Sequence, residues 1–76
     1  MKENAGYKIV KEEMYNEKYG IVLGINEKAF AKYVTWELSI SYDEPYFFWG
    51  HYFENEKQAL EDYHKRLANY YKELPF

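Results

Sequence analysis

The sequence predicts an α+β fold, an antiparallel β-meander of three or four strands with one C-terminal α-helix packed on one face. Residues 33–41 alternate between polar and apolar side chains, which is typical of a half-buried strand. Residues 55–74 repeat apolar side chains every three or four positions, which is typical of an amphipathic helix. The chain has 76 residues, a length that favours one domain, residues 1–76.

The first two expected strands differ in their burial. Residues 7–15 mix β-forming side chains with charges, which favours an exposed edge strand. Residues 19–25 form a short β-branched run between turn residues, which favours a buried central strand. Gly20 and Gly24 would weaken that strand, or mark a bulge or a close approach of backbone. Residues 26–32 form a polar connection with room for one helical turn.

Residues 33–41 and 46–53 are expected to form a hairpin. We interpret the intervening residues 42–45 as a four-residue turn, because Asp favours turns and Pro45 cannot donate to a β-ladder. This turn pairs Ser41 with Tyr46, and a slip of one residue would reverse every side chain. On this register the face against which the helix packs carries Val34, Trp36, Leu38, Ile40, Phe47, Trp49 and Phe53.

The C-terminal helix has recognisable ends. Asn55 is a good N-cap, and Gln58 follows at the spacing of a capping box. Pro75 is expected to end the helix. One apolar stripe, widened by Leu60 and Tyr71, runs through Ala59, Tyr63, Leu67, Tyr70 and Leu74.

Composition limits the possible classes of function. The chain contains no cysteine, so disulfides and cysteine zinc sites are excluded, and its 22% aromatic residues or an oligomer must stabilise a chain this small. A formal net charge of −3 argues against a broad surface for duplex DNA. No apolar run approaches the ~18 residues of a membrane helix, and no secretory signal is visible. We therefore expect a cytoplasmic protein that does not associate with membranes.

Few residues indicate catalysis or metal binding. Glu61 and His64 share one helix face at a spacing that di-metal bundles use twice, but here it occurs once, so we interpret it as a solvated face. His51 could act as a general base or a pH switch, but no cysteine and no Ser–Asp spacing supports a nucleophilic relay. We interpret His51 as a hydrogen-bonded packing residue beneath Trp36. The sequence thus predicts no enzyme, no metal site and no cofactor.

The sheet face opposite the helix is left uncovered by this fold and carries aromatic side chains. Exposed contiguous aromatic residues mark interaction surfaces, and tyrosine combines a large rigid area with one polar tip. The sequence therefore predicts a non-catalytic protein-binding module with an unidentified protein partner. The candidate binding residues are Tyr33, Tyr46, Phe48 and Tyr52, with Glu37 among them.

Three alternatives remain for the same face. Residues 1–6 or 26–32 could cover the rings within the chain. The rings could form a homodimer interface. They could also stack the bases of a single-stranded nucleic acid, although the expected strands offer only Lys32 nearby and Glu37 opposes phosphate. A nucleic-acid partner is therefore the least favoured.

Three strings of residues together resemble those of short uncharacterised accessory proteins from phages and conjugative elements of Gram-positive bacteria. The strings are Tyr33-Val34-Thr35-Trp36, the run Tyr-Phe-Phe-Trp-Gly-His-Tyr-Phe at 46–53, and Ala-Leu-Glu-Asp-Tyr-His-Lys-Arg at 59–66. The resemblance covers residues 19–67 and assigns no site residue. It implies a mobile-element context, in which small acidic inhibitors of host defence proteins, such as anti-CRISPR-like factors, are common.

Overall fold

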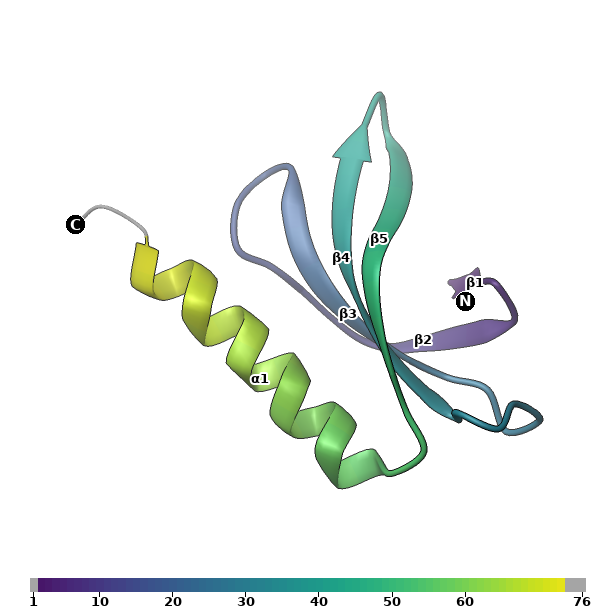
Figure 1. The fold of residues 1–76 in the computed structure, drawn as a ribbon. Coiled ribbons are helices and arrows are strands. Elements are labelled where there is room, and N and C mark those ends of the chain that lie inside the picture. The colour runs from purple at the N-terminus through teal and green to yellow at the C-terminus, as the bar shows by residue number, and fades with distance from the viewer. Residues whose placement is uncertain (1, 74–76) are drawn as a thin grey trace.

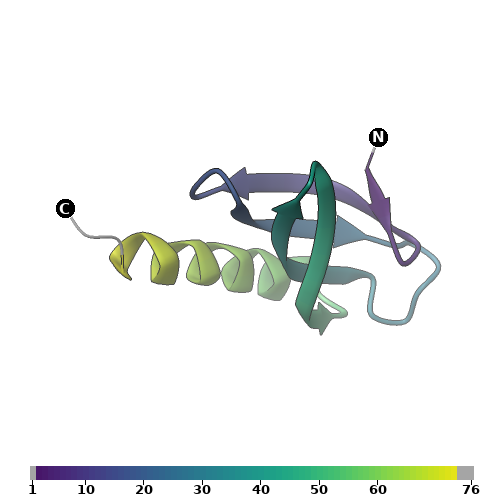
Figure 2. The ribbon, with the colours of Figure 1, turned by 90° about the horizontal axis from the view of Figure 1, so that it is seen from above.

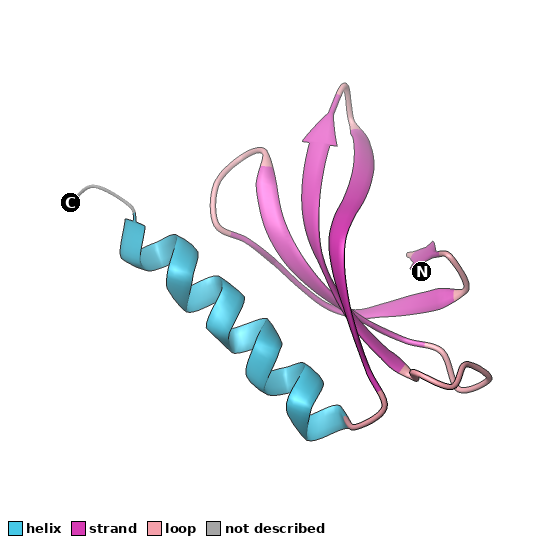
Figure 3. Ribbon diagram, in the orientation of Figure 1, coloured by secondary structure: helices cyan, strands magenta, loops and turns pink. Residues whose placement is uncertain are grey.

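The computed structural model describes residues 2–73 and shows an α+β fold with one curled antiparallel sheet and one C-terminal helix (Figure 1). The sheet has five strands in chain order, so the meander is confirmed but three or four strands are too few. The elements are β1 (Glu3–Asn4), β2 (Tyr7–Met14), β3 (Tyr19–Ile25), β4 (Tyr33–Ser41), β5 (Glu44–Phe53) and α1 (Glu56–Glu73). Figure 3 shows the helix lying to one side of the strands.

The extra strand, β1, results from a tight turn at Ala5 and Gly6. Both residues have positive φ, 51° and 85°, so the chain reverses and Asn4 pairs with Tyr7. Alanine is an uncommon residue in this conformation, which is why the sequence pattern does not indicate the turn. Residues 26–32 contain turns and bends without a helical turn.

The β4–β5 hairpin closes with a two-residue turn instead of the expected four-residue turn. Tyr42 and Asp43 have φ of 52° and 65°, the signs that a type I′ turn requires, and Ser41 pairs with Glu44. Strand β5 therefore begins two residues earlier than predicted. Pro45 fits within it because β5 is an edge strand, where one missing N–H is tolerated.

The helix packs on the sheet face opposite to the one predicted. Its buried Ala59, Tyr63 and Leu67 form a cluster with Ile21 and Leu23, and partly buried Tyr33 and Phe53 join that cluster. Period-two alternation distinguishes the two faces of a strand but not which of them the helix covers. The prediction that the helix covers Val34, Trp36 and Leu38 is therefore wrong.

The wholly apolar face is buried because the sheet curls upon itself. The ring of Tyr7, in β2, packs edge-on against Trp36 at 5.7 Å and against Tyr52, in β5, at 6.0 Å between centroids. These contacts close a second core around Val22, Val34 and Leu38. Figure 2 shows the strong twist that brings β5 across the meander. Curling thus replaces the covering layer that the flat meander would need.

The start of the helix is as predicted. The Oδ1 atom of Asn55 accepts a hydrogen bond from the backbone N–H of Gln58 at 3.2 Å, so Asn55 is the N-cap. The expected apolar stripe is buried at Ala59, Tyr63 and Leu67, while Leu74 and Pro75 lie outside the described residues. Over its described length, α1 is not apolar enough to cross a membrane.

Candidate binding site

A β-bulge in β5 is centred on Trp49 and Gly50. Thr35 pairs with His51 and Glu37 pairs with Phe48, so one β4 residue lies opposite two β5 residues. Trp49 has a φ of 51°, a conformation in which a bulky side chain is a genuine outlier. Its side chain is 69% exposed. Regular alternation would bury the indole of Trp49, and the bulge turns it outward instead.

Glycine is required beside Trp49 because the sheet leaves no space for a side chain there. A Cβ at position 50 would lie 2.7 Å from Nε1 of Trp36 and 2.9 Å from its Cδ1. The backbone of the bulge is also tied to the helix, since Nη2 of Arg66 donates to the carbonyl oxygen of Trp49 at 2.5 Å. Packing below and a charged hydrogen bond from α1 thus hold the backbone of the bulge from which the indole projects.

The exposed indole forms one wall of an aromatic groove between the sheet and the helix. The groove has a volume of about 430 Å³. Tyr15 lies between two other tyrosines, with its ring centroid 4.2 Å from Tyr70 and 6.4 Å from Tyr19. The Phe48 ring packs edge-on against Trp49 at 5.0 Å. The residues that line the groove are Tyr15, Tyr19, Glu37, Phe48, Trp49 and Tyr70.

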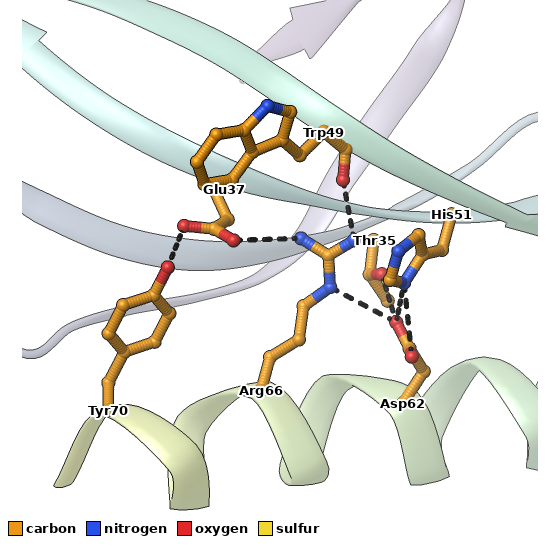
Figure 4. A network of polar contacts seen from close by, with 7 residues as sticks. All are labelled: Thr35, Glu37, Trp49, His51, Asp62, Arg66 and Tyr70. Atoms are coloured by element: carbon orange, nitrogen blue, oxygen red, sulfur yellow. Dashed lines mark hydrogen bonds and ion pairs between the residues drawn. The ribbon is translucent and has the colours of Figure 1, made fainter. Parts of the chain in front are cut away.

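A polar network beneath this groove joins the helix to the sheet (Figure 4). The Arg66 side chain is only 8% exposed; its Nε donates to Asp62 at 3.2 Å, and its Nη1 lies 3.5 Å from Oε2 of Glu37. Nη1 has no hydrogen-bond partner among the described residues. The hydroxyl of Tyr70 donates to Oε1 of Glu37. Arg66 thus neutralises part of the charge of two carboxylates.

Asp62 is the centre of the second half of the network. Its Oδ2 accepts a hydrogen bond from the hydroxyl of Thr35 at 2.5 Å, and His51 Nδ1 lies 3.0 Å away. Burial raises the pKa of this carboxyl, but hydrogen bonds from Thr35 and His51 and the positive charge of Arg66 outweigh it, so the pKa of Asp62 is lowered. The charged form of Asp62 is therefore favoured in the folded chain.

For the phenols of Tyr15 and Tyr70 the net pKa shift is upward, because no interaction outweighs burial. Burial raises the pKa of Tyr70, as do the hydrogen bond to Glu37 and the charge of that carboxylate. The pKa of Tyr15 is raised mainly by burial, with Glu37 adding to the effect. The neutral form of both phenols beside Glu37 is therefore favoured.

His51 differs from the packing residue that the sequence predicts. It lies opposite Thr35 rather than Trp36, and its side chain is 54% exposed. Nδ1 is the ring nitrogen that contacts Asp62. Among the described residues, its side-chain hydrogen bonds go to Asp62 and to no hydroxyl. The pair resembles half of a catalytic relay without the nucleophile.

The predicted binding residues are divided by the structure. Glu37 and Phe48 come together in the groove. Tyr33 is half-buried in the core beneath the helix, so its expected exposure is wrong. Tyr46 is 55% exposed but outside the lining of the groove, and Tyr52 is 54% exposed on the opposite face, beside Trp36.

Sequence reasoning missed four of the lining residues: Tyr15, Tyr19, Trp49 and Tyr70. The sequence pattern places Trp49 on the helix-packed face because alternation is continued through position 50, and it places Tyr70 in the apolar stripe of the helix because of its helical spacing. The available signal was Gly50 itself, since a glycine inside a strand often marks a bulge. Tyr15 and Tyr19 flank a short hairpin loop, where Oδ1 of Asn16 accepts hydrogen bonds from the backbone of Lys18 and Tyr19.

A second pocket of about 420 Å³ adjoins the groove and is lined by Glu37, Trp49, His51, Arg66, Asn69 and Tyr70. Within residues 2–73, no group of three or more histidine or carboxylate side chains could hold a metal ion.

Comparison of the chain with protein-family models, curated protein sequences and solved structures gives no match.

Proposed function

We propose that this chain is a non-catalytic protein-binding module whose binding surface is the aromatic groove with Trp49 at its edge. The observation that carries the proposal is the exposed Trp49 side chain on a backbone with φ of 51°. Such backbone conformations cost ~1–3 kcal/mol and are concentrated at functional sites. The exposed indole belongs to neither core. Contact with a partner would bury it and would account for its exposure.

The surroundings of Trp49 support the same function. Aromatic side chains are enriched at protein interfaces, and tryptophan and tyrosine dominate the residues that contribute most to binding. Phe48 and Tyr19 stand beside the indole, and Tyr19 is 36% exposed. The hydrogen bond from Arg66 holds the bulge before any partner arrives. A rigid surface loses less conformational entropy on binding.

The proposal is tested with Trp49→Asn, because asparagine accepts positive φ and lacks the indole. Tyr42→Asn is the matched control: Tyr42 also has positive φ, and its side chain is 99% exposed at the distant hairpin turn. The parent chain and both variants are immobilised, and retained proteins from a bacterial lysate are compared quantitatively. We expect a protein that the parent and Tyr42→Asn retain and Trp49→Asn loses. Equal retention on all three would overturn the proposal.

The finer form of the proposal is an anti-CRISPR-like inhibitor of a host defence protein carried by a mobile element. Its support is the net charge of −3 and the resemblance of residues 19–67 to mobile-element proteins. An acidic protein with aromatic anchors suits the basic groove of a nucleic-acid-binding partner. Identification of the captured protein tests this form directly, because a partner without such a groove would exclude it.

A homodimer is the second candidate, since two copies could bury each other's Trp49. Light scattering after size exclusion measures the mass of the chain in solution. A monomer at high concentration contradicts this candidate, whereas a dimer that Trp49→Asn dissociates favours it over a foreign partner. Single-stranded nucleic acid is the remaining alternative, and failure to retain a labelled oligonucleotide at physiological salt would remove it.

A further inference from the structure

We propose that the aromatic groove binds an arginine side chain of the partner, with the guanidinium stacked on the rings and paired with Glu37. The inference rests on the proposed function and names the chemical group that the surface recognises. It follows from three features of the groove: the ring faces, the carboxylate among them and the local balance of charge.

The walls of the groove suit a cation. Faces of tyrosine, phenylalanine and tryptophan rings carry negative potential and attract ammonium or guanidinium groups within ~6 Å of the ring centre. The chain already shows this attraction, because Nζ of Lys18 lies 5.5 Å from the centroid of Tyr19. The groove volume of about 430 Å³ lies within the range of ~300–1,000 Å³ that is typical of sites for small groups.

Glu37 makes a purely apolar occupant unfavourable. Its side chain is 12% exposed, so a partner that covers the groove removes the remaining water from the carboxylate. Burying a charge without a new polar partner is costly. A carboxylate has about four acceptor positions, and Glu37 receives one hydrogen bond from Tyr70 and faces Arg66 at 3.5 Å. Capacity therefore remains for a cationic donor.

The local charge balance also favours a cation. Glu37 and Asp62 share the single guanidinium of Arg66. With histidine counted as neutral, this group carries a formal charge of −1. Glu13 adds a further carboxylate on the same sheet face, because Ile21 pairs with both Glu13 and Glu37. Its Oε2 accepts a hydrogen bond from Tyr71. When Lys18 beside Tyr19 is counted as well, three carboxylates face two cations, so one negative charge remains uncompensated where an anion would bind.

Arginine fits better than lysine because the groove is open along its wall. Trp49 and Tyr19 are 69% and 36% exposed, so the rings form faces along a cleft rather than an enclosed cage. A planar guanidinium is weakly hydrated, stacks on such faces and still donates to a carboxylate. An ammonium group is more strongly hydrated and offers no flat surface for stacking.

The test uses NMR titration of the nitrogen-15-labelled 76-residue chain with capped single amino acids. The ligands are N-acetyl-arginine-N-methylamide, the corresponding lysine compound, and the citrulline compound as a neutral analogue of arginine. We expect saturable shifts of the Trp49 indole N–H and of the Glu37 amide, with arginine binding tightest and in the millimolar range. Binding of citrulline as tight as arginine, or of lysine tighter than arginine, overturns the proposal.

Variants locate the contact. Glu37→Gln keeps an acceptor for Tyr70 but removes the charge, and it should weaken arginine binding by about three- to tenfold. Glu44→Gln is the control, because it makes the same change of charge at an exposed position of β5. Trp49→Asn should also weaken binding, so the conclusion does not depend on one substitution. Equal effects of Glu37→Gln and Glu44→Gln contradict the assigned contact.

The two proposals fail separately. If arginine does not bind while Trp49→Asn still loses the captured protein, the binding surface stands and the arginine inference is wrong. If arginine binds and capture is independent of Trp49, the groove recognises guanidinium but is not the protein-binding surface.

Discussion

Trp49 combines an unfavourable backbone with an exposed side chain, so its contribution to stability is small. Removal of the indole loses the edge-on contact with Phe48, worth ~0.5–1.5 kcal/mol. Asparagine relieves a backbone conformation that costs ~1–2 kcal/mol for most residues. We therefore expect Trp49→Asn to change the free energy of unfolding by less than ~1 kcal/mol, whereas truncating a buried tryptophan costs ~3–5 kcal/mol. Urea denaturation measures the change.

Tyr42→Asn provides the reference for that measurement. Tyr42 has the same backbone conformation, with φ of 52° and a side chain that is 99% exposed. Its replacement relieves the turn and loses almost no packing, so its stability should equal or exceed that of the parent chain. A Trp49→Asn variant that is much less stable than Tyr42→Asn would mean that the indole has a structural role.

Gly50→Ala should destabilise the chain through a specific contact. The added methyl would lie 2.7 Å from Nε1 of Trp36, which is itself 4% exposed and cannot move without disturbing the core. Overpacking of this kind typically costs ~1–3 kcal/mol. Urea denaturation checks the loss, and an unchanged midpoint would show that the bulge yields easily and does not fix the indole.

The bulge also shows where sequence reasoning on single residues stops. A register prediction needs the turn length and every bulge, and each error moves a side chain to the other face. The two-residue turn and the bulge shift different parts of β5. Phe47 therefore joins the apolar face as predicted, Trp49 leaves it, and Tyr52 enters it.

At the scale of elements, strands and the start of the helix were predictable where the signal is local. Residues 19–25 and 33–41 form strands at the predicted bounds, and Asn55 caps the helix, because alternation and capping involve neighbours in sequence. On the face that receives the helix, Asp62 and Arg66 meet Thr35 and Glu37. That match of polar groups is long-range and is not visible in either segment alone.

The contacts of Asp62 between the helix and the sheet should weaken at acidic pH. The pKa of Asp62 in the folded chain is below its ordinary value of 3.8, so folding favours the ionised carboxylate. Its contribution to stability is present above pH 3.8 and is lost as the pH falls through the folded pKa. We expect Asp62→Asn to lower stability at neutral pH. We also expect the variant to lose less stability than the parent chain as the pH falls below 3.8.

Urea midpoints measured between neutral and strongly acidic pH check this expectation. Glu61→Gln is the matched control, because it removes a neighbouring carboxyl from the exposed side of the same helix. The control should keep the acid dependence of the parent chain. Parallel pH profiles for Asp62→Asn and the parent would show that other carboxyl groups cause the acid sensitivity.

At the scale of the whole molecule, stability without disulfides comes from two aromatic cores on opposite faces of one sheet. One is sealed by curling around Trp36, and the other by the helix over Ile21 and Leu23. The aromatic composition predicted dense packing but not this division. Curvature decides the division, and it depends on the bulge and on strand twist rather than on residue type.

Because Tyr63 is buried in the helix-covered core, we expect the folded chain to lose stability at high pH. Burial raises the pKa of Tyr63 to about 12, and the nearby charges of Glu13 and Glu12 add to the effect. Since the ordinary value is 10.0, folding favours the neutral phenol; this stabilisation is complete below pH 10 and is lost as the pH rises through about 12. Tyr63→Phe keeps the ring without the ionisable hydroxyl, so the variant should retain more of its stability than the parent above pH 10.

An alkaline titration tests this expectation. Circular dichroism measures the loss of helix, and tyrosinate absorbance measures ionisation in the same samples. Tyr42→Phe, at the 99% exposed turn residue, is the control. If helix loss in Tyr63→Phe coincides with that of the parent and the control, ionisation of Tyr63 does not detach the helix, and another group sets the alkaline limit.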